Sequence, residues 1–151
     1  MEGEIGALRT PPAAVSSINF QSERIPVMTR SEFFSHVLDT YGITPDYPFE
    51  EDFVTAVFRH TGNRKWFALA MCIPRAKVGL AGEGSMDAVN LKVSPEMLPG
   101  LWQEAGVFPA YHMNKTHWVT VALDGTASED TVAFLTGVSF DLTAAKAKKR
   151  R

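Results

Sequence analysis

Apolar residues recur with helical spacing in two segments of the chain. Near residue 30, Thr29 and Glu32 have the spacing of a capping box, and Gly42 is suited to end the helix. The apolar stripe between them consists of Phe33, Phe34, Val37, Leu38 and Tyr41. Near the C-terminus, Ser128 is placed to cap a second helix, with two carboxylates in its first turn. The pattern predicts helices over about residues 30–41 and 128–139.

A third helical segment follows Ser94, with Pro95 at a first helical position that has no need of its amide. Pro99 and Gly100 come a few residues later, and Gly106 is suited to close the segment. Proline inside a helix removes a hydrogen bond and clashes with the preceding turn. We therefore expect this helix to be kinked or to start twice.

Segments rich in β-forming residues, separated by turn residues, predict five strands. Their expected ranges are 53–59, 65–73, 88–93, 108–113 and 116–123. Residues 74–85 form a long glycine-containing excursion with a short extended piece at 78–80, and Asn114-Lys115 is the expected tip of a hairpin. The resulting order, α-β-β-β-α-β-β-α, predicts an α+β fold: two layers, with a five-stranded, mainly antiparallel sheet and helices on one face.

The alternation of side chains assigns the strand faces. The expected inward set is Phe67, Leu69, Met71, Ile73, Val89, Leu91, Val93, Val119, Val121 and Leu123. The face without helices would then carry Trp66, Asn90, Lys92, Trp118 and Thr120. Two indoles beside an amide and an ammonium resemble a platform on which bases stack and phosphate is bound. In the alternative interpretation the tryptophans simply cover the sheet or lie under a loop.

The charge distribution limits how such a surface could bind nucleic acid. The formal net charge of the 151-residue chain is −2, but residues 28–145 alone carry −6, whereas residues 146–151 hold five bases. DNA-binding domains usually carry excess positive charge, because phosphate neutralisation supplies most of the affinity. Binding would have to come from a local patch, from the basic tail or from stacking.

The remaining composition is that of one globular domain, in which 45% of the residues are apolar. Cys72 is the only cysteine, so no internal disulfide can form and a reducing compartment is expected. No apolar run approaches the roughly 20 residues that span a bilayer. We expect a flexible arm or upstream sequence at 1–27, the domain at 28–143 and a basic tail at 144–151.

The segment Tyr-His-Met-Asn-Lys-Thr-His-Trp at 111–118 is distinctive. Together with Tyr47-Pro48-Phe49, Trp66-Phe67-Ala68-Leu69, Val89-Asn90-Leu91-Lys92 and Ser139-Phe140-Asp141-Leu142, it resembles the MmcQ/YjbR family over roughly residues 28–143. The resemblance implies a small, cytosolic, bacterial α+β domain with a frataxin-like or secretion-chaperone-like fold. It also implies DNA binding through a double-wing motif.

The family pattern and the sheet face together select nine candidate nucleic-acid-binding residues: Trp66, Asn90, Lys92, Tyr111, His112, Asn114, Lys115, His117 and Trp118. The lysines can meet phosphate, Asn114 can read a base edge, and Tyr111 or Trp118 can stack on bases. Structural interpretations compete with these roles. Asn114-Lys115 suits a tight turn, and His117 shares the inward side with Val119, which favours a core histidine.

No segment carries the signature of a catalytic or metal site. His112 and His117 lack the further ligands that zinc needs, and the acidic run at 46–52 lacks the spacing of a calcium loop. The glycines of the 74–85 excursion lack the Lys-Ser/Thr of a phosphate loop. We therefore expect a non-catalytic protein without cofactor or metal, which binds DNA weakly and in a salt-sensitive way. The alternative is a module that binds a protein partner or a second copy of itself; no membrane association is expected.

Overall fold

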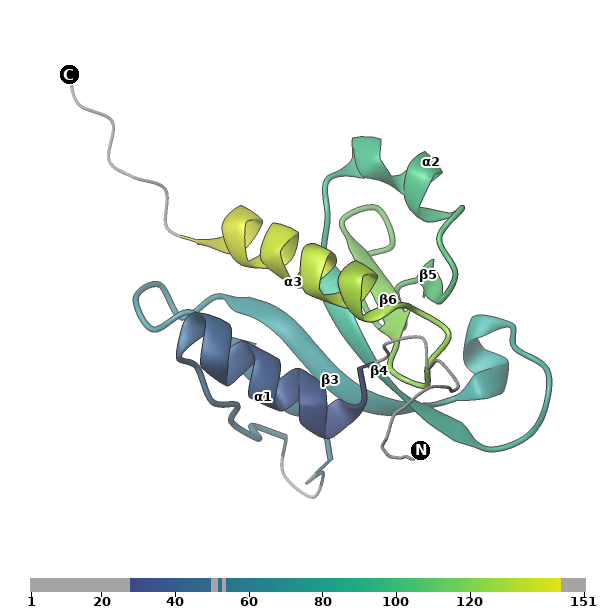
Figure 1. The fold of residues 1–151 in the computed structure, drawn as a ribbon, viewed down its shortest axis with the longest axis horizontal. Coiled ribbons are helices and arrows are strands. Elements are labelled where there is room, and N and C mark those ends of the chain that lie inside the picture. Colours follow the sequence, from purple (N-terminus) through teal and green to yellow (C-terminus); the bar gives the residue numbers. More distant parts are fainter. Residues whose placement is uncertain (1–27, 50–51, 53, 145–151) are drawn as a thin grey trace, which may run out of the picture.

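The computed structural model describes residues 28–49, 52 and 54–144. Three α-helices, α1 (Arg30–Tyr41), α2 (Leu98–Leu101) and α3 (Glu129–Thr143), accompany five strands, β2 (Ala56–Arg59), β3 (Trp66–Pro74), β4 (Ser85–Lys92), β5 (Val107–Pro109) and β6 (Trp118–Ala122). Two short 3₁₀ turns, η1 (Arg75–Val78) and η2 (Pro95–Met97), follow β3 and β4. The strands form one antiparallel sheet in the order β2-β3-β4-β6-β5. The α+β class and the order of elements are as predicted (Figure 1).

The helix ends follow the local sequence signals. Thr29 and Glu32 form the complete capping box at the start of α1, and Gly42 ends the helix in the left-handed conformation at φ 72°. Ser128 Oγ accepts the Thr131 amide at the start of α3. The helix after β4 does start twice, as the 3₁₀ turn η2 followed by α2. The last helix runs four residues beyond the predicted end, to Thr143.

The main core lies between the sheet and the helices α1 and α3, which lie on the same face (Figure 1). Its largest fully buried side chains include Phe33, Phe58, Phe67 and Leu135. Ser139 of α3 is fully buried and ties the helix to the sheet: its hydroxyl donates to the Phe67 carbonyl at 2.5 Å and accepts the Lys92 amide at 2.8 Å. This hydroxyl thereby bridges β3 and β4 one residue beyond their last pair, Ala68 with Leu91.

The predicted facing of β3 is wrong for Leu69, Met71 and Ile73. The β2–β3 register shifts between Phe58 and Arg59, which is a β-bulge. Phe67 and Ala68 therefore both belong to the helix-side core, and the alternation reverses beyond this point. Alanines at 68 and 70 lie under the helices, whereas the larger residues at 69, 71 and 73 lie on the other face.

The helix-free face is not an open platform, which corrects a second expectation. Leu69, Met71, Ile73 and Met86 form a smaller core there, and residues of two loops pack against it. Val78 and Leu80 come from the excursion between β3 and β4; Tyr111 and Met113 come from the loop between β5 and β6. The two loops supply the cover that helices supply on the other face.

The remaining differences are in extent. The piece expected to be extended at 78–80 overlaps the 3₁₀ turn η1, and β4 begins at Ser85 rather than at residue 88. β5 ends at Pro109, so residues 110–117 form a loop instead of two strand ends. The predicted start of the first strand at 53, the N-terminal arm at 1–27 and the tail beyond Ala144 lie outside the described residues. Within the described part of the chain, no helix is long and apolar enough to cross a bilayer.

Candidate nucleic-acid interface

A closed ring of hydrogen bonds holds the β5–β6 loop against the helix-free face. The Tyr111 amide donates to Thr120 Oγ1 at 2.8 Å, the Thr120 hydroxyl donates to Asn90 Oδ1 at 2.5 Å, and Asn90 Nδ2 donates to the Tyr111 carbonyl at 2.9 Å. Asn90 and Thr120 are fully buried. Asn90 therefore cannot reach a nucleic-acid base from this position, and its observed role is to fix the backbone of Tyr111.

The outer part of the loop is a turn organised by Asn114. Its Oδ1 accepts the amides of Thr116 and His117 at 2.8 and 3.1 Å, and its carbonyl accepts the Trp118 amide at 3.0 Å. The turn interpretation of Asn114 is thus confirmed. His117 is exposed, so the expected core position for this histidine is wrong. Lys115 at the tip is exposed as well.

Tyr111 and His112 form a ridge that divides the helix-free face into two hollows. Their rings lie 3.9 Å apart between centroids. His112 has a φ of 64°, in the left-handed region that non-glycine residues seldom adopt. Such a conformation costs free energy and persists where the surroundings enforce it. Here the hydrogen-bonded backbone of Tyr111 immediately before it supplies that constraint.

The first hollow, which we call the basic hollow, has a volume of about 450 Å³. Its charged and titratable lining residues are Lys77, His112 and Lys115, and Val78, Pro109, Ala110 and Tyr111 complete it. Lys77 comes from η1 and Lys115 from the β5–β6 loop, so two segments remote in sequence contribute cations to one site. The sequence reasoning missed Lys77, because nothing in the excursion indicates that it folds beside the hairpin loop.

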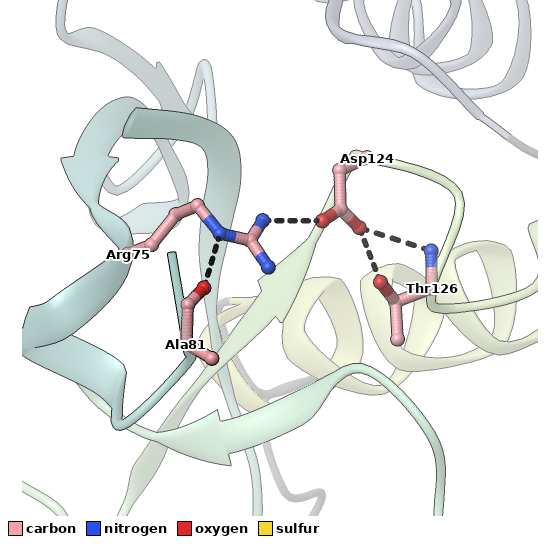
Figure 2. Close-up of polar contacts among 4 residues, drawn as sticks. All are labelled: Arg75, Ala81, Asp124 and Thr126. Carbon is pink, nitrogen blue, oxygen red and sulfur yellow. Dashed lines mark hydrogen bonds and ion pairs between the residues drawn. The ribbon is translucent and has the colours of Figure 1, made fainter. Parts of the chain in front are cut away.

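The excursion that carries Lys77 is anchored by Arg75, as Figure 2 shows. Arg75 Nε donates to the Ala81 carbonyl at 3.1 Å, and Nη1 lies 3.4 Å from Asp124 Oδ2 in the turn after β6. Burial by itself would raise the pKa of Asp124, but hydrogen bonds from the Thr126 hydroxyl and amide and from Arg75 bring the pKa below its ordinary value. The carboxylate therefore stays ionised and holds the excursion in place.

Trp66, Lys92 and Trp118 lie on three adjacent strands, at the same end of the sheet. Lys92 lies opposite Trp118 in the β4–β6 register, and Trp66 begins β3 at the same end, where Ala68 pairs with Leu91. All three side chains are half-buried. The register places these three predicted site residues at the same end of the sheet, whereas Asn90 lies beneath the loop.

The ring of Trp66 also contacts other residues of the fold. The Arg59 guanidinium lies over its ring at 5.7 Å from the centroid, and Asp46 pairs with Arg59 at 3.0 Å. Phe49 meets the indole nearly at right angles, with 6.0 Å between the ring centroids. Part of the Trp66 surface is therefore used within the fold and is not free to stack on a base.

The second hollow, the aromatic hollow, has a volume of about 520 Å³. Strand β3 forms its floor with Trp66, Leu69, Met71 and Cys72; Phe49, Asp52 and Thr55 line one side, and Tyr111, His112 and Met113 the other. The sequence analysis assigned no role to Phe49 or Asp52. Their contribution depends on how the connection before β2 folds against β3, which no local pattern indicates.

Asp52 is the carboxylate of the aromatic hollow. Hydrogen bonds from the Thr55 hydroxyl at 2.7 Å and from the Thr55 and Val54 amides at 2.9 Å lower its pKa below the ordinary value. It therefore carries a negative charge at neutral pH. Among the residues that the structure describes, no three histidine, cysteine or carboxylate side chains come together as a metal ion would require.

The fold and the site define the class of protein, which is an α+β domain in which two loops cover the second face of the sheet. The exposed lysines and the histidine of the basic hollow lie on these two loops. Comparison with known proteins identifies the relatives of this chain. The family model for YjbR matches residues 38–142. The Bacillus subtilis protein YyaQ is 41% identical over 117 residues, which are 78% of this chain and 99% of YyaQ. The chain belongs to the YjbR family.

Solved structures agree with this assignment. A crystal structure of a Pseudomonas syringae protein matches with a TM-score of 0.75 and 43% identity, over 78% of this chain and all of that one. The Deinococcus radiodurans protein DR2400 matches with a TM-score of 0.57 and 26% identity, over 83% of this chain and 85% of that one. The names of these relatives state no activity. Kinship therefore establishes the family and the fold, and the function must be argued from the surface.

Proposed function

We propose that this protein is a non-catalytic nucleic-acid-binding protein, which contacts phosphates through the loop between β5 and β6 and through the neighbouring η1 turn. The observation that carries the proposal is the gathering of Lys77, His112 and Lys115 around one hollow. Residues 28–145 carry a net charge of −6, so a grouping of basic side chains differs in sign from the domain as a whole. The two lysines form a local positive patch of the kind that binds phosphate.

The end of the face formed by Trp66, Lys92 and Trp118 supports the same role. The half-buried indoles of Trp66 and Trp118 keep part of their rings accessible for stacking on bases. The Lys92 ammonium, on the strand position opposite Trp118, can contact the sugar-phosphate backbone of the nucleic acid. Asn90 is not part of the proposed interface, because it is buried. Binding through so few cations on an acidic body should be weak, and log K should fall with log salt by a slope of about 0.9 for each phosphate contact.

Fluorescence anisotropy with labelled single-stranded and duplex DNA, at low and at moderate salt, tests the proposal on the full chain. We expect Lys77→Glu and Lys115→Glu each to weaken binding severalfold and, together, to reduce the slope of log K against log salt by roughly 1 to 2. Arg64→Glu is the matched control: the same charge change on an exposed residue that lines a different hollow, beside Asp46 and Arg59. It should retain most of the affinity.

The basic tail requires a separate variant, because five bases at 146–151 can bind DNA without the domain. If deletion of residues 146–151 abolished binding while the Lys77 and Lys115 variants bound like Arg64→Glu, the loop would not be the site. The alternative function is a protein-interaction or dimerisation module. It would use apolar residues on the other layer, such as the exposed Phe134 and Leu142 of α3, and would be insensitive to these lysine changes.

A further inference from the structure

We propose that the aromatic hollow is a binding site for a small organic cation, an ammonium group carried on an apolar body. The hollow lies on the opposite side of the Tyr111–His112 ridge from the basic hollow, and its chemistry is different. The proposal does not require nucleic-acid binding, although Trp66 and His112 belong to both surfaces. It rests on the rings, the carboxylate and the apolar floor that three separate segments bring together.

Three aromatic rings, those of Phe49, Trp66 and Tyr111, line the hollow. Phe49 and Trp66 meet at 89°, and Tyr111 lines the hollow from the far side. An ammonium within about 6 Å of such ring centroids is attracted by their quadrupoles, more strongly where water is excluded. The backbone of Tyr111 is held at both its amide and its carbonyl, so that wall is preorganised.

The charges around the hollow favour a cation over an anion. Asp52 lines it as an ionised carboxylate, and neither lysine nor arginine is among its described lining residues. His112 is the one side chain of basic character in the described lining, and Arg30, which does not line the hollow, interacts electrostatically with Asp52. Arg59 lies over the Trp66 ring but is paired with Asp46 and does not line the hollow. An anionic ligand would find its partners across the ridge, at Lys77 and Lys115.

The floor indicates that the cation is organic. Leu69, Met71 and Met113 line the hollow and offer no ligand that a hard metal ion prefers. Among the residues that the structure describes, no cluster of metal ligands includes Asp52. A volume of about 520 Å³ is in the range of small-molecule sites and accommodates an apolar body beside the charged group.

The test compares choline with its neutral isostere 3,3-dimethylbutan-1-ol, which has the same shape without the charge. Binding to the full chain is followed by NMR through the indole N–H of Trp66, identified by its loss in Trp66→Phe. We expect a saturable shift with choline and at least about tenfold weaker binding of the isostere. Benzyltrimethylammonium, with a larger apolar body, should bind more tightly than choline.

Two variants separate the contributions, and each has a folded-state check by thermal melting. Asp52→Asn keeps an oxygen acceptor for the Val54 and Thr55 amides and should weaken choline binding by about tenfold, without affecting the isostere. Phe49→Leu removes a ring face at a partly exposed position and should cost about threefold. The matched control is Asp39→Asn, which makes the same charge change at an exposed site on α1.

Equal affinity for choline and the isostere would overturn the proposal, as would an Asp52→Asn variant that binds choline like Asp39→Asn. Absence of any saturable shift in the millimolar range would overturn it too. None of these results tests the proposed phosphate contacts, which are tested through Lys77 and Lys115. Failure of one proposal is therefore distinguishable from failure of the other.

Discussion

At the scale of single residues, Gly106 is a position where the fold has no room for a Cβ. It precedes β5 with a φ of 84°, and its carbonyl accepts the Ala122 amide at 2.8 Å. A Cβ added there would lie 2.5 Å from the Ala127 nitrogen and 2.7 Å from the Ala127 Cβ. Gly106→Ala should therefore lower the free energy of unfolding by more than about 2 kcal/mol, measured by urea denaturation.

The control for this prediction is Gly100→Ala. Gly100 lies in α2 with open space around the position of its missing Cβ, and alanine has the higher helix propensity. This variant should be neutral or up to about 1 kcal/mol more stable than the wild type. Similar losses in the two variants would mean that the close approach of Gly106 to Ala127 does not constrain the fold.

The residue scale also shows how far a sequence can take the candidate site. The Asn114 turn follows from the chemistry of asparagine alone, because its side chain hydrogen-bonds to backbone amides two and three residues ahead. Asn90 has the right position in its strand but the wrong assigned role. The strand pattern places Asn90 on the outward face, which suggests a contact residue. The loop that covers it lies 21 residues further along the chain, at Tyr111, and the strand pattern gives no information about that loop.

At the scale of elements, the loop between β5 and β6 depends on the ring formed by Asn90, Thr120 and Tyr111. Thr120→Val keeps the side-chain volume but leaves the Tyr111 amide and Asn90 Oδ1 without their partner. Because these groups are buried or half-buried, we expect a loss of about 2–4 kcal/mol in the free energy of unfolding. Hydrogen exchange of the Tyr111 amide should become faster, since its acceptor has been removed.

Thr136→Val serves as the comparison. Thr136 is equally buried, but its hydroxyl donates to the Val132 carbonyl one turn back within α3. Its removal leaves the helix backbone bonding unchanged and should cost less than about 1 kcal/mol. If both valine variants lost the same stability, the ring around Tyr111 would contribute nothing beyond an ordinary buried hydroxyl.

Element boundaries and strand faces were predictable to different degrees. Helix starts depend on nearby residues, so both caps of α1 and the N-cap of α3 were found correctly, whereas the end of α3 was placed four residues too early. The facing of β3 depends on a bulge opposite Phe58 and Arg59 and on Ser139, 72 residues beyond Phe67, which bridges the strands. The alternation of side chains cannot reveal an extra residue that reverses it. The two hollows could not be predicted either, because each is lined by segments that are far apart in the sequence.

At the scale of the whole molecule, the turn after β2 and the end of α3 are joined at His60. This residue is buried, and its Nε2 lies 2.8 Å from Thr143 Oγ1, whose hydroxyl donates to the Ser139 carbonyl. Asn63 Nδ2 also donates to the Thr143 carbonyl at 2.9 Å. These contacts join residues 80 or more positions apart, so a change of charge at His60 acts on the packing of the domain.

Burial lowers the pKa of His60 below its ordinary value of 6.5, against an opposing contribution from the Phe140 backbone. Between the lowered pKa and 6.5 the unfolded chain binds more protons than the folded one, so the free energy of unfolding falls as the pH drops through this window. His60→Gln, which cannot titrate, should show a smaller loss than the wild type between about pH 7.5 and 5.5. Urea midpoints across this range measure it. The control is His117→Gln, at an exposed histidine, in which the free energy of unfolding should depend on pH as in the wild type. If His60→Gln also kept the wild-type dependence on pH, the buried ring would not couple protonation to folding.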